Sequence, residues 1–299
     1  MSKKLYSKTA ITYADQLNQL KTRGLVIEDE QKALHLLEVI SYYRLSGYWY
    51  PFLVDKKNHK FKENSSFEAA FNLYKFDREL RMLVTRELEK IEISIRAKMI
   101  YILSHNRGPF WYKDSANFKN SYKHQETLDK IISEYNRSDE DFVKAFKNNY
   151  SDELPPSWMI FEISSFGTLS SLYSNFIPGK DKQEIAKFFG LNDKVFSSWI
   201  HCIVYIRNVC AHHTRLWNKI MRIQPLVPRK TFNQWLVNKT VSNNRTYFTL
   251  SMVVYFMNII NPKHTIVERF NGLLKKYPNV DTRAMGFPID WVNEPLWKK

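Results

Sequence analysis

The chain contains little glycine and almost no cysteine. Of its 299 residues, 8 are glycine and two are cysteine, Cys202 and Cys210. Two cysteines cannot build a disulfide framework, so the sequence excludes the disulfide-rich secreted class and fits a reducing cytoplasm. Cys210, His212 and His213 also lack the second pair of cysteines or histidines that a zinc finger needs. We therefore expect no metal site and no cofactor.

Long hydrophobic runs are missing as well. No apolar stretch of the signal-peptide kind follows Met1. The most apolar segment, residues 248–260, contains Ser251 and Asn258 and is shorter than the roughly 20 residues of a membrane-spanning helix. We expect a buried helix there, no association with membranes, and a cytoplasmic protein.

Acidic residues are scarce relative to basic ones. The chain has 45 lysines and arginines against 30 aspartates and glutamates, a formal net charge of +15. Positions 201–299 alone hold 15 basic and 4 acidic residues. Clustered positive charge attracts nucleic acids or anionic membranes. Because no segment combines a basic face with a clear apolar one, we favour a nucleic acid as the partner.

Apolar residues recur mostly at three- and four-residue steps, which predicts an all-α fold. The longest such segment, residues 66–104, is expected to be a single spine helix. Leu154, Pro155 and Pro156 suggest a hinge, which divides the chain into an N-terminal helical region (1–154) and a C-terminal helical region (155–299). The other expected helices cover residues 12–22, 28–46, 121–135, 139–149, 157–176, 181–189, 192–213, 231–239, 244–260 and 263–276.

An arginine and a histidine lie five positions apart at the end of the helix expected over 192–213. Arg207 can hold a phosphate through two parallel hydrogen bonds, and His212 can transfer a proton near neutral pH. Asn208, next to the arginine, can orient one of them. Together these residues form a minimal set for cutting RNA without a metal. His213 is a second candidate for the proton transfer, since five positions correspond to about 140° of helical rotation and do not rank the two histidines.

The chain resembles the bacterial abortive-infection (Abi) family, the AbiD/AbiF-like proteins, in four stretches. These are Arg23-Gly24-Leu25 with residues 42–52 (YYRLSGYWYPF); residues 76–81 (FDRELR) with Ile91, Glu92 and Arg96; residues 155–158 (PPSW) with Glu162 and residues 166–170 (FGTLS); and residues 207–213 (RNVCAHH) with 215–218 (RLWN), 285–288 (MGFP) and Trp291.

This resemblance implies a role in phage defence and membership of the HEPN group, an all-helical group in which an Arg-x4-His motif marks many metal-independent RNases. It implies a HEPN-like helical bundle with additional N- and C-terminal helices, in which Arg207, Asn208 and His212 are catalytic. HEPN nucleases usually join two motifs across a dimer. Because this chain has one motif, with Tyr101 five positions after Arg96, we expect a homodimer.

Other residues allow two interpretations. Arg44, His213, Arg215 and Lys219 are candidate RNA contacts, although an arginine near a helix end also stabilises the helix dipole. The aromatic residues at 42–52 either stack on bases or pack a helix junction, and we favour packing. Glu92 and Arg96 either form an ordinary i,i+4 pair or support Arg207 from behind.

Two functions follow for the whole chain. The first is a metal-independent endoribonuclease that leaves a 2′,3′-cyclic phosphate. The second is a non-catalytic protein that binds a structured small RNA, in which Arg207 and His212 only touch phosphate.

Overall fold

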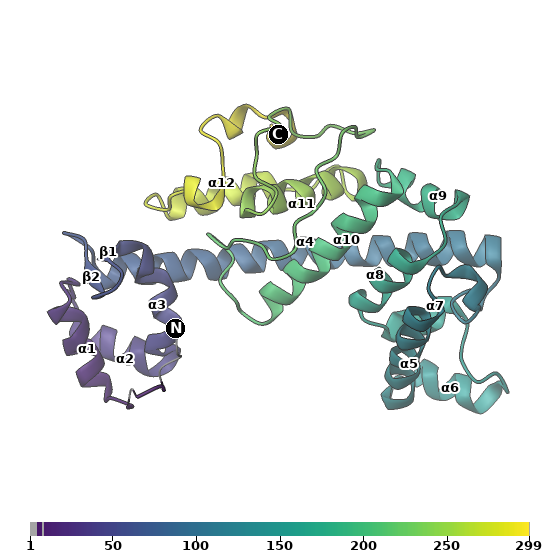
Figure 1. The fold of residues 1–299 in the computed structure, drawn as a ribbon, viewed down its shortest axis with the longest axis horizontal. Coiled ribbons are helices and arrows are strands. Elements are labelled where there is room, and N and C mark those ends of the chain that lie inside the picture. The colour runs from purple at the N-terminus through teal and green to yellow at the C-terminus, as the bar shows by residue number, and fades with distance from the viewer. Residues whose placement is uncertain (1–4, 8, 299) are drawn as a thin grey trace. The chain divides into compact units, whose positions relative to one another are not determined.

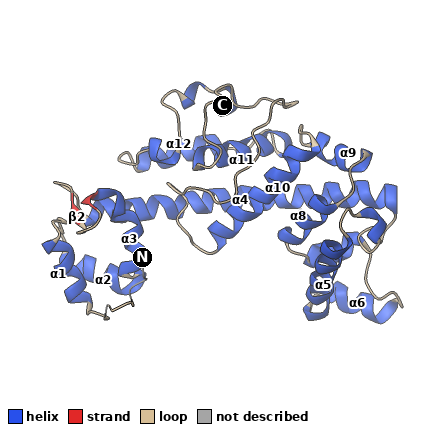
Figure 2. Cartoon of the chain, in the orientation of Figure 1, coloured by secondary structure: helices blue, strands red, loops and turns tan. Residues whose placement is uncertain are grey.

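The computed structural model describes residues 5–7 and 9–298, and it confirms the all-α class (Figure 1). The described residues form twelve α-helices, and a single pair of short strands accompanies them (Figure 2). The finer prediction, a HEPN-like arrangement of the helices, stays a prediction.

The chain divides into two compact units. The first contains the residues up to Glu79 together with Leu273–Val280. The second contains Leu80–Gly272 and the residues from Asp281 onward. Helix α4, Phe67–Arg107, is continuous over 41 residues and contributes to both units, which confirms the long helix predicted over 66–104. The boundary expected near residue 154 lies inside the second unit, and a division there stays a prediction.

The first unit is built from short helices and a small hairpin around the beginning of α4. Thr12 and Asp15 form a reciprocal capping box at the start of the first helix, in which the side chain of each accepts a hydrogen bond from the backbone N–H of the other. The elements are α1 (Tyr13–Thr22), α2 (Glu30–Ile40), α3 (Tyr42–Trp49), the 3-10 turn η1 (Tyr50–Phe52), and the antiparallel strands β1 (Leu53–Asp55) and β2 (Lys60–Phe61).

The aromatic segment at 42–52 packs this first unit. Tyr48 and Trp49 are buried, and the Trp49 ring lies 5.1 Å from that of Tyr42 and 6.1 Å from that of Phe67. The Tyr48 hydroxyl donates a hydrogen bond of 2.7 Å to the buried carboxylate of Asp77. The packing interpretation is therefore confirmed for Tyr48 and Trp49.

The single helix predicted over 28–46 is wrong, because the chain breaks at Ser41. Ser41 adopts a positive φ of 79°, which is uncommon for a residue with a side chain. Its hydroxyl accepts a hydrogen bond from the N–H of Arg44, so it ends α2 and caps α3. The apolar spacing continues across this break, and periodicity alone did not reveal it.

The second unit contains the remaining helices. Within it, α10 packs along α8 and α9, and α8 packs against α5. Its elements after α4 are η2 (Ser115–Asn117), α5 (Ser121–Arg137), α6 (Asp141–Asn149), α7 (Ser157–Ile163), α8 (Phe166–Asn175), α9 (Lys180–Phe188), α10 (Asp193–Ala211), α11 (Thr246–Ile260), α12 (Ile266–Lys276, whose last turns belong to the first unit), η3 (Arg283–Met285), η4 (Trp291–Asn293) and η5 (Pro295–Trp297).

Two helix predictions in this unit need correction. Residues 157–176 form two helices, because Ser164 is extended and the Ser165 hydroxyl caps α8 by accepting a 3.2 Å hydrogen bond from Thr168 N–H. Residues 231–239 are not helical. There the N–H groups of Val237 and Asn238 each donate a 2.8 Å hydrogen bond to the buried carboxylate of Glu294. In a helix these two N–H groups would instead donate to the backbone carbonyls four residues earlier.

The C-terminal segment docks on the second unit, as the sequence predicts. Met285, Phe287, Leu296 and Trp297 are buried. The Trp297 ring stacks 5.7 Å from that of Tyr247 on α11, and its Nε1 donates a 3.0 Å hydrogen bond to the hydroxyl of Ser251. Helix α11 itself is buried along most of its length, which confirms the buried helix expected at 248–260.

Candidate functional site

Helix α10 carries the Arg-x4-His motif at its carboxyl end. Asn192 begins the helix by accepting a 2.9 Å hydrogen bond from Val195 N–H through its side chain. One face of the helix is apolar and buried, which fixes the rotation of the helix in the unit. That face consists of Val195, Phe196, Trp199, Ile200, Cys202, Ile203, Ile206, Val209 and Cys210.

The helix ends inside the motif. Ala211 is the last helical residue, and His212 N–H still donates a 2.9 Å hydrogen bond to the Asn208 carbonyl. Thr214 N–H then donates to the Val209 carbonyl (2.9 Å), and His213 N–H donates to the Cys210 carbonyl (3.0 Å). These two bonds form a Schellman motif, which satisfies the last carbonyls of the helix. His212 therefore projects from the helix terminus, where its backbone departs from ideal helical geometry.

His213 occupies the left-handed position of this cap. Its φ is +54°, in the region that most helices fill with glycine at this point. A histidine in this conformation costs about 1–2 kcal/mol relative to a residue without a Cβ. Backbone strain of this kind is often found at functional sites.

The three side chains predicted to be catalytic are all solvent-exposed. Arg207, Asn208 and His212 form no side-chain hydrogen bond or ion pair with the residues that the structure describes. Asn208 and His212 are four positions apart and lie one above the other on the helix, while Arg207 lies on the adjacent part of the exposed face. A phosphate can approach this face without displacing an internal partner of any of the three.

The residues after the helix return at once to the core. Leu216 and Trp217 are buried, and their carbonyls accept hydrogen bonds of 2.8 and 3.0 Å from the hydroxyl of Thr246 at the start of α11. Arg215 and Lys219, on either side of this anchor, are partly exposed. Their predicted contacts with RNA, like that of exposed His213, stay predictions.

Arg44 belongs to the other unit. It is exposed on α3, next to the buried aromatic residues of the first unit. The predicted contact of Arg44 with phosphate stays a prediction.

Glu92 and Arg96 form an ion pair within α4. Arg96 Nη2 lies 2.9 Å from a carboxylate oxygen of Glu92, and Nη1 lies 3.8 Å from a carboxylate oxygen of Glu162 on α7. Both members of the pair are mostly buried, with side-chain exposures of 13% for Arg96 and 16% for Glu92. These contacts suit an ordinary helix pair that extends to α7. A supporting role behind Arg207 stays a prediction.

The cysteines are placed in the core. Burial raises the pKa of the Cys202 thiol to about 12, and its Sγ donates a long 3.7 Å hydrogen bond to the Ile223 carbonyl. Cys210 is buried in the last turn of α10. Among the residues that the structure describes, no three histidine, cysteine, aspartate or glutamate side chains are grouped so that they could hold a metal ion.

The sequence interpretation missed one feature of α10. His201 precedes Asn208 by seven residues and His212 by eleven, which is close to two and three helical turns. His201 is exposed and Tyr205, between them, is half-buried. These residues therefore share one side of the helix with Asn208 and His212, and a helical projection of the sequence would have shown it.

A sequence model of the Abi-like proteins matches residues 35–218, which is more than half of the chain. The chain belongs to the Abi-like protein family. Membership suggests a role in abortive infection, a form of defence against phage. Among curated proteins none matches the chain, and none matches among solved structures.

The matched region of this Abi-like protein ends just after the motif. It includes the aromatic segment of α3, most of the second unit, and α10 with Arg207, Asn208 and His212, while α11, α12 and the C-terminal segment follow it. No helix in the described part of the chain has both the length and the apolar character of a membrane span.

Proposed function

We propose that this Abi-like protein is a metal-independent endoribonuclease of the HEPN type that acts in abortive infection. One observation carries the proposal. An arginine, an asparagine and a histidine in the Arg-x4-His arrangement are exposed at the carboxyl end of α10, without internal side-chain partners among the described residues. These three side chains are therefore free to meet a ligand.

The chemistry uses the nucleophile that RNA itself carries. A base removes the proton of the 2′-hydroxyl, the 2′-oxygen forms a bond to the adjacent phosphorus, and the bond from phosphorus to the 5′-oxygen breaks. An acid then protonates the leaving 5′-oxygen. The products are a 2′,3′-cyclic phosphate and a 5′-hydroxyl end, with no water consumed and no change of oxidation state.

Each side chain has a role in this scheme. His212 transfers a proton. General acid–base catalysis of this kind typically increases the rate by about 10²–10⁴-fold. Arg207 holds the phosphate and offsets the negative charge that builds on its oxygens in the transition state. Asn208, one turn below His212, orients the imidazole or the phosphate by hydrogen bonding.

Two proton transfers need two groups. One copy of the chain supplies one Arg-x4-His motif, so we propose that a second copy supplies the other and that the active form is a homodimer. The approximately 140° between Arg207 and His212 on the helix supports this arrangement, because side chains from two copies can converge on one phosphate more readily than two side chains of one helix.

End-group analysis of RNA tests the activity. Purified wild-type protein and the variants His212→Ala and Arg207→Ala are incubated with RNA, and the new ends are identified. The wild type is expected to produce cyclic phosphate ends, and each variant is expected to lose at least about 100-fold in rate. His35→Ala, which changes an exposed histidine of α2 in the first unit, is the matched control and should retain full activity.

Two outcomes would contradict the proposal. If the His212→Ala variant cleaves as fast as the wild type, His212 has no part in the reaction. If the chelator EDTA abolishes cleavage, the reaction depends on a metal. Binding of a structured RNA without any new ends would instead favour the second function, a non-catalytic RNA-binding protein.

A further inference from the structure

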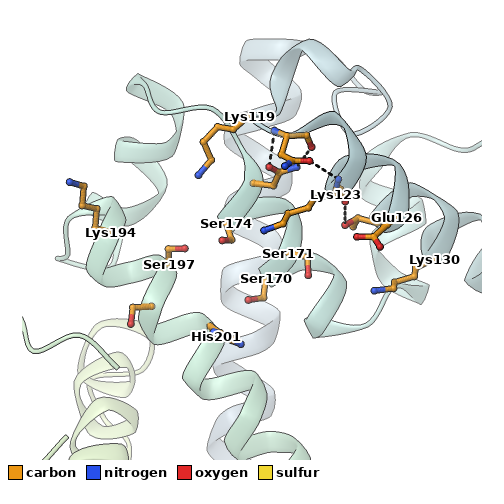
Figure 3. A pocket seen from close by; sticks show the side chains of 14 residues that line it. Lys119, Lys123, Glu126, Lys130, Ser170, Ser171, Ser174, Lys194, Ser197 and His201 are labelled. Carbon is orange, nitrogen blue, oxygen red and sulfur yellow. Dashed lines mark hydrogen bonds between the residues drawn. The ribbon is translucent and has the colours of Figure 1, made fainter. Parts of the chain in front are cut away.

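An open groove of about 730 Å³ lies in the second unit, between α5, α8 and α10 (Figure 3). Lys194, Ser197 and His201 of α10 border one side. Lys123, Glu126 and Lys130 of α5 border the other side, and three serines of α8 lie between them. The groove belongs to neither the core nor the Arg-x4-His motif.

The groove is positively charged. Four lysines line it, Lys119, Lys123, Lys130 and Lys194, against one carboxylate, that of Glu126. All four lysines are exposed, and none forms an ion pair with another described residue. A concave surface lined by one sign of charge concentrates counter-ions in it. The groove is therefore suited to a ligand with several negative charges.

The local structure fixes the beginning of α5, next to Lys119 and Lys123, beside the groove. The Asn120 N–H donates a 3.1 Å hydrogen bond to the side-chain oxygen of Asn175, and the Asn175 amide donates one of 2.8 Å to the Asn120 carbonyl. This reciprocal pair ties the beginning of α5 to the end of α8. The Asn120 side chain also caps α5 by accepting a hydrogen bond from Lys123 N–H. Because of these bonds, the positive end of the α5 dipole borders the groove together with Lys119 and Lys123.

Lys182, a buried lysine beside the groove, has a lowered pKa. The pKa of Lys182 is lowered to about 8, mainly by burial and also by the charge of Lys119. Its ammonium donates hydrogen bonds to the carbonyls of Ser174 (3.2 Å) and Phe176 (3.3 Å) at the end of α8.

Apart from the imidazole of His201 at its edge, the lining contains no aromatic ring, and its other polar groups are hydroxyls, amides, ammonium groups and the carboxylate of Glu126. Five serines from α8 and α10 contribute hydroxyls that can donate to phosphate oxygens. Proteins that hold single strands through their bases usually provide aromatic rings for stacking. This groove is therefore suited to the phosphates of a nucleic acid strand rather than to its bases.

Helix α10 connects the groove to the motif. His201, at the edge of the groove, lies on the same side of α10 as Asn208 and His212. Eleven residues of α-helix span about 16 Å, a distance that a strand a few nucleotides long can cover.

We propose that this groove binds the phosphodiester backbone of a single-stranded RNA, which continues along the exposed side of α10 to Arg207 and His212. The identity of the ligand as RNA rests on the proposed function. The affinity of the groove for a polyanionic strand rests on its own lining. The groove contacts phosphates, so its affinity is independent of base sequence and falls steeply with salt.

Binding of an RNA that cannot be cleaved tests this proposal. The probe is an oligonucleotide of about 20 residues whose 2′-hydroxyls are all methylated, which removes the nucleophile. Its affinity is measured by fluorescence anisotropy at several salt concentrations, for the wild type and for the double variant Lys123→Gln with Lys130→Gln. Both lysines are exposed on α5, and glutamine has a similar helix propensity, so the variant is expected to fold normally.

The matched control removes the same amount of charge elsewhere in the second unit. It carries Lys187→Gln and Lys263→Gln, two exposed lysines outside the groove. Circular dichroism checks that both double variants retain the helical content of the wild type. A polyglutamate peptide of similar length serves as a second polyanion.

For a single strand, each lost phosphate contact reduces the magnitude of the negative slope of log K against log salt by about 0.7. The groove variant is therefore expected to bind more weakly, with a slope smaller in magnitude by about 1.4, and the control is expected to match the wild type. An unchanged slope in the groove variant, an equal change in the control, or equally groove-dependent binding of polyglutamate would overturn the proposal.

A separate cleavage assay on unmodified RNA distinguishes this proposal from the function on which it rests. Groove-dependent binding without cleavage by the wild type would support the groove and refute the nuclease activity. Cleavage with groove-independent binding would refute the groove alone.

Discussion

The cap at the end of α10 predicts an unusual effect of glycine on stability. His213 holds a φ of +54° at the position of the Schellman motif where glycine is preferred. Replacing it with glycine removes a conformational cost of about 1–2 kcal/mol. Glycine also makes the unfolded chain more flexible, which destabilises the folded state by about 0.5–1 kcal/mol and offsets part of this gain in stability.

Comparison of two variants isolates the cost of a Cβ atom in the left-handed conformation at position 213. His213→Gly and His213→Ala both remove the imidazole and its contacts, so that loss cancels between them, and only alanine retains the Cβ that the left-handed conformation disfavours. The difference leaves His213→Gly more stable than His213→Ala by about 0.5–1 kcal/mol. For a cooperative unit of 150–250 residues, this corresponds to a difference in Tm of about 1–4 °C.

Thermal unfolding followed by circular dichroism measures this difference, and chemical denaturation provides a second estimate. An alanine variant as stable as the glycine variant, or more stable, would show that residue 213 is not held in the left-handed conformation. The same pair also ranks the two histidines. Because we assign the proton transfer to His212, His213→Gly should retain RNA cleavage, and complete loss of cleavage in that variant would transfer the role to His213.

Two further predictions concern stability. Burial lowers the pKa of Lys182 to about 8, whereas the unfolded chain has an ordinary lysine pKa near 10.5. Between these two pH values the unfolded state binds more protons than the folded state. Lys182 therefore makes the free energy of unfolding increase as the pH rises through this range. Lys182→Met should therefore remove part of the pH dependence of Tm between about pH 8 and 10; a variant and wild type with parallel profiles would contradict this. Trp297→Ala should lower the free energy of unfolding by about 3–5 kcal/mol, because Trp297 is buried against Tyr247 and its Nε1 bonds to Ser251. A loss below about 1 kcal/mol in urea denaturation would show that the C-terminal segment adds little to the second unit.

Local signals in the sequence predicted most helices because those signals are the physical causes of the helices. Asn192 caps α10 through its own side chain, and the apolar stripe of α4 is what α4 buries. The break at Ser41 escaped prediction because a positive φ leaves no mark on the apolar pattern. The loop at 231–239 escaped prediction because its partner, Glu294, is more than fifty residues away in the chain.

The candidate site also contains features that the sequence could predict and features that it could not. Arg207, Asn208 and His212 are neighbours in the sequence, so their shared position at the end of one helix could be predicted. The groove combines Lys123 of α5 with Lys194 of α10 and serines of α8, and only the packing of these helices brings them together. Arg44 lies in the other unit, and its place in the aromatic segment at 42–52 did not predict this.

The decisive experiment on the proposed nuclease is identification of the RNA ends produced by wild-type protein and by His212→Ala. We expect 2′,3′-cyclic phosphate and 5′-hydroxyl ends with the wild type in the presence of EDTA, and a loss of at least about 100-fold in rate with the variant. Wild-type protein that yields no such ends from any RNA it binds, or a variant that yields them at the wild-type rate, would contradict this expectation.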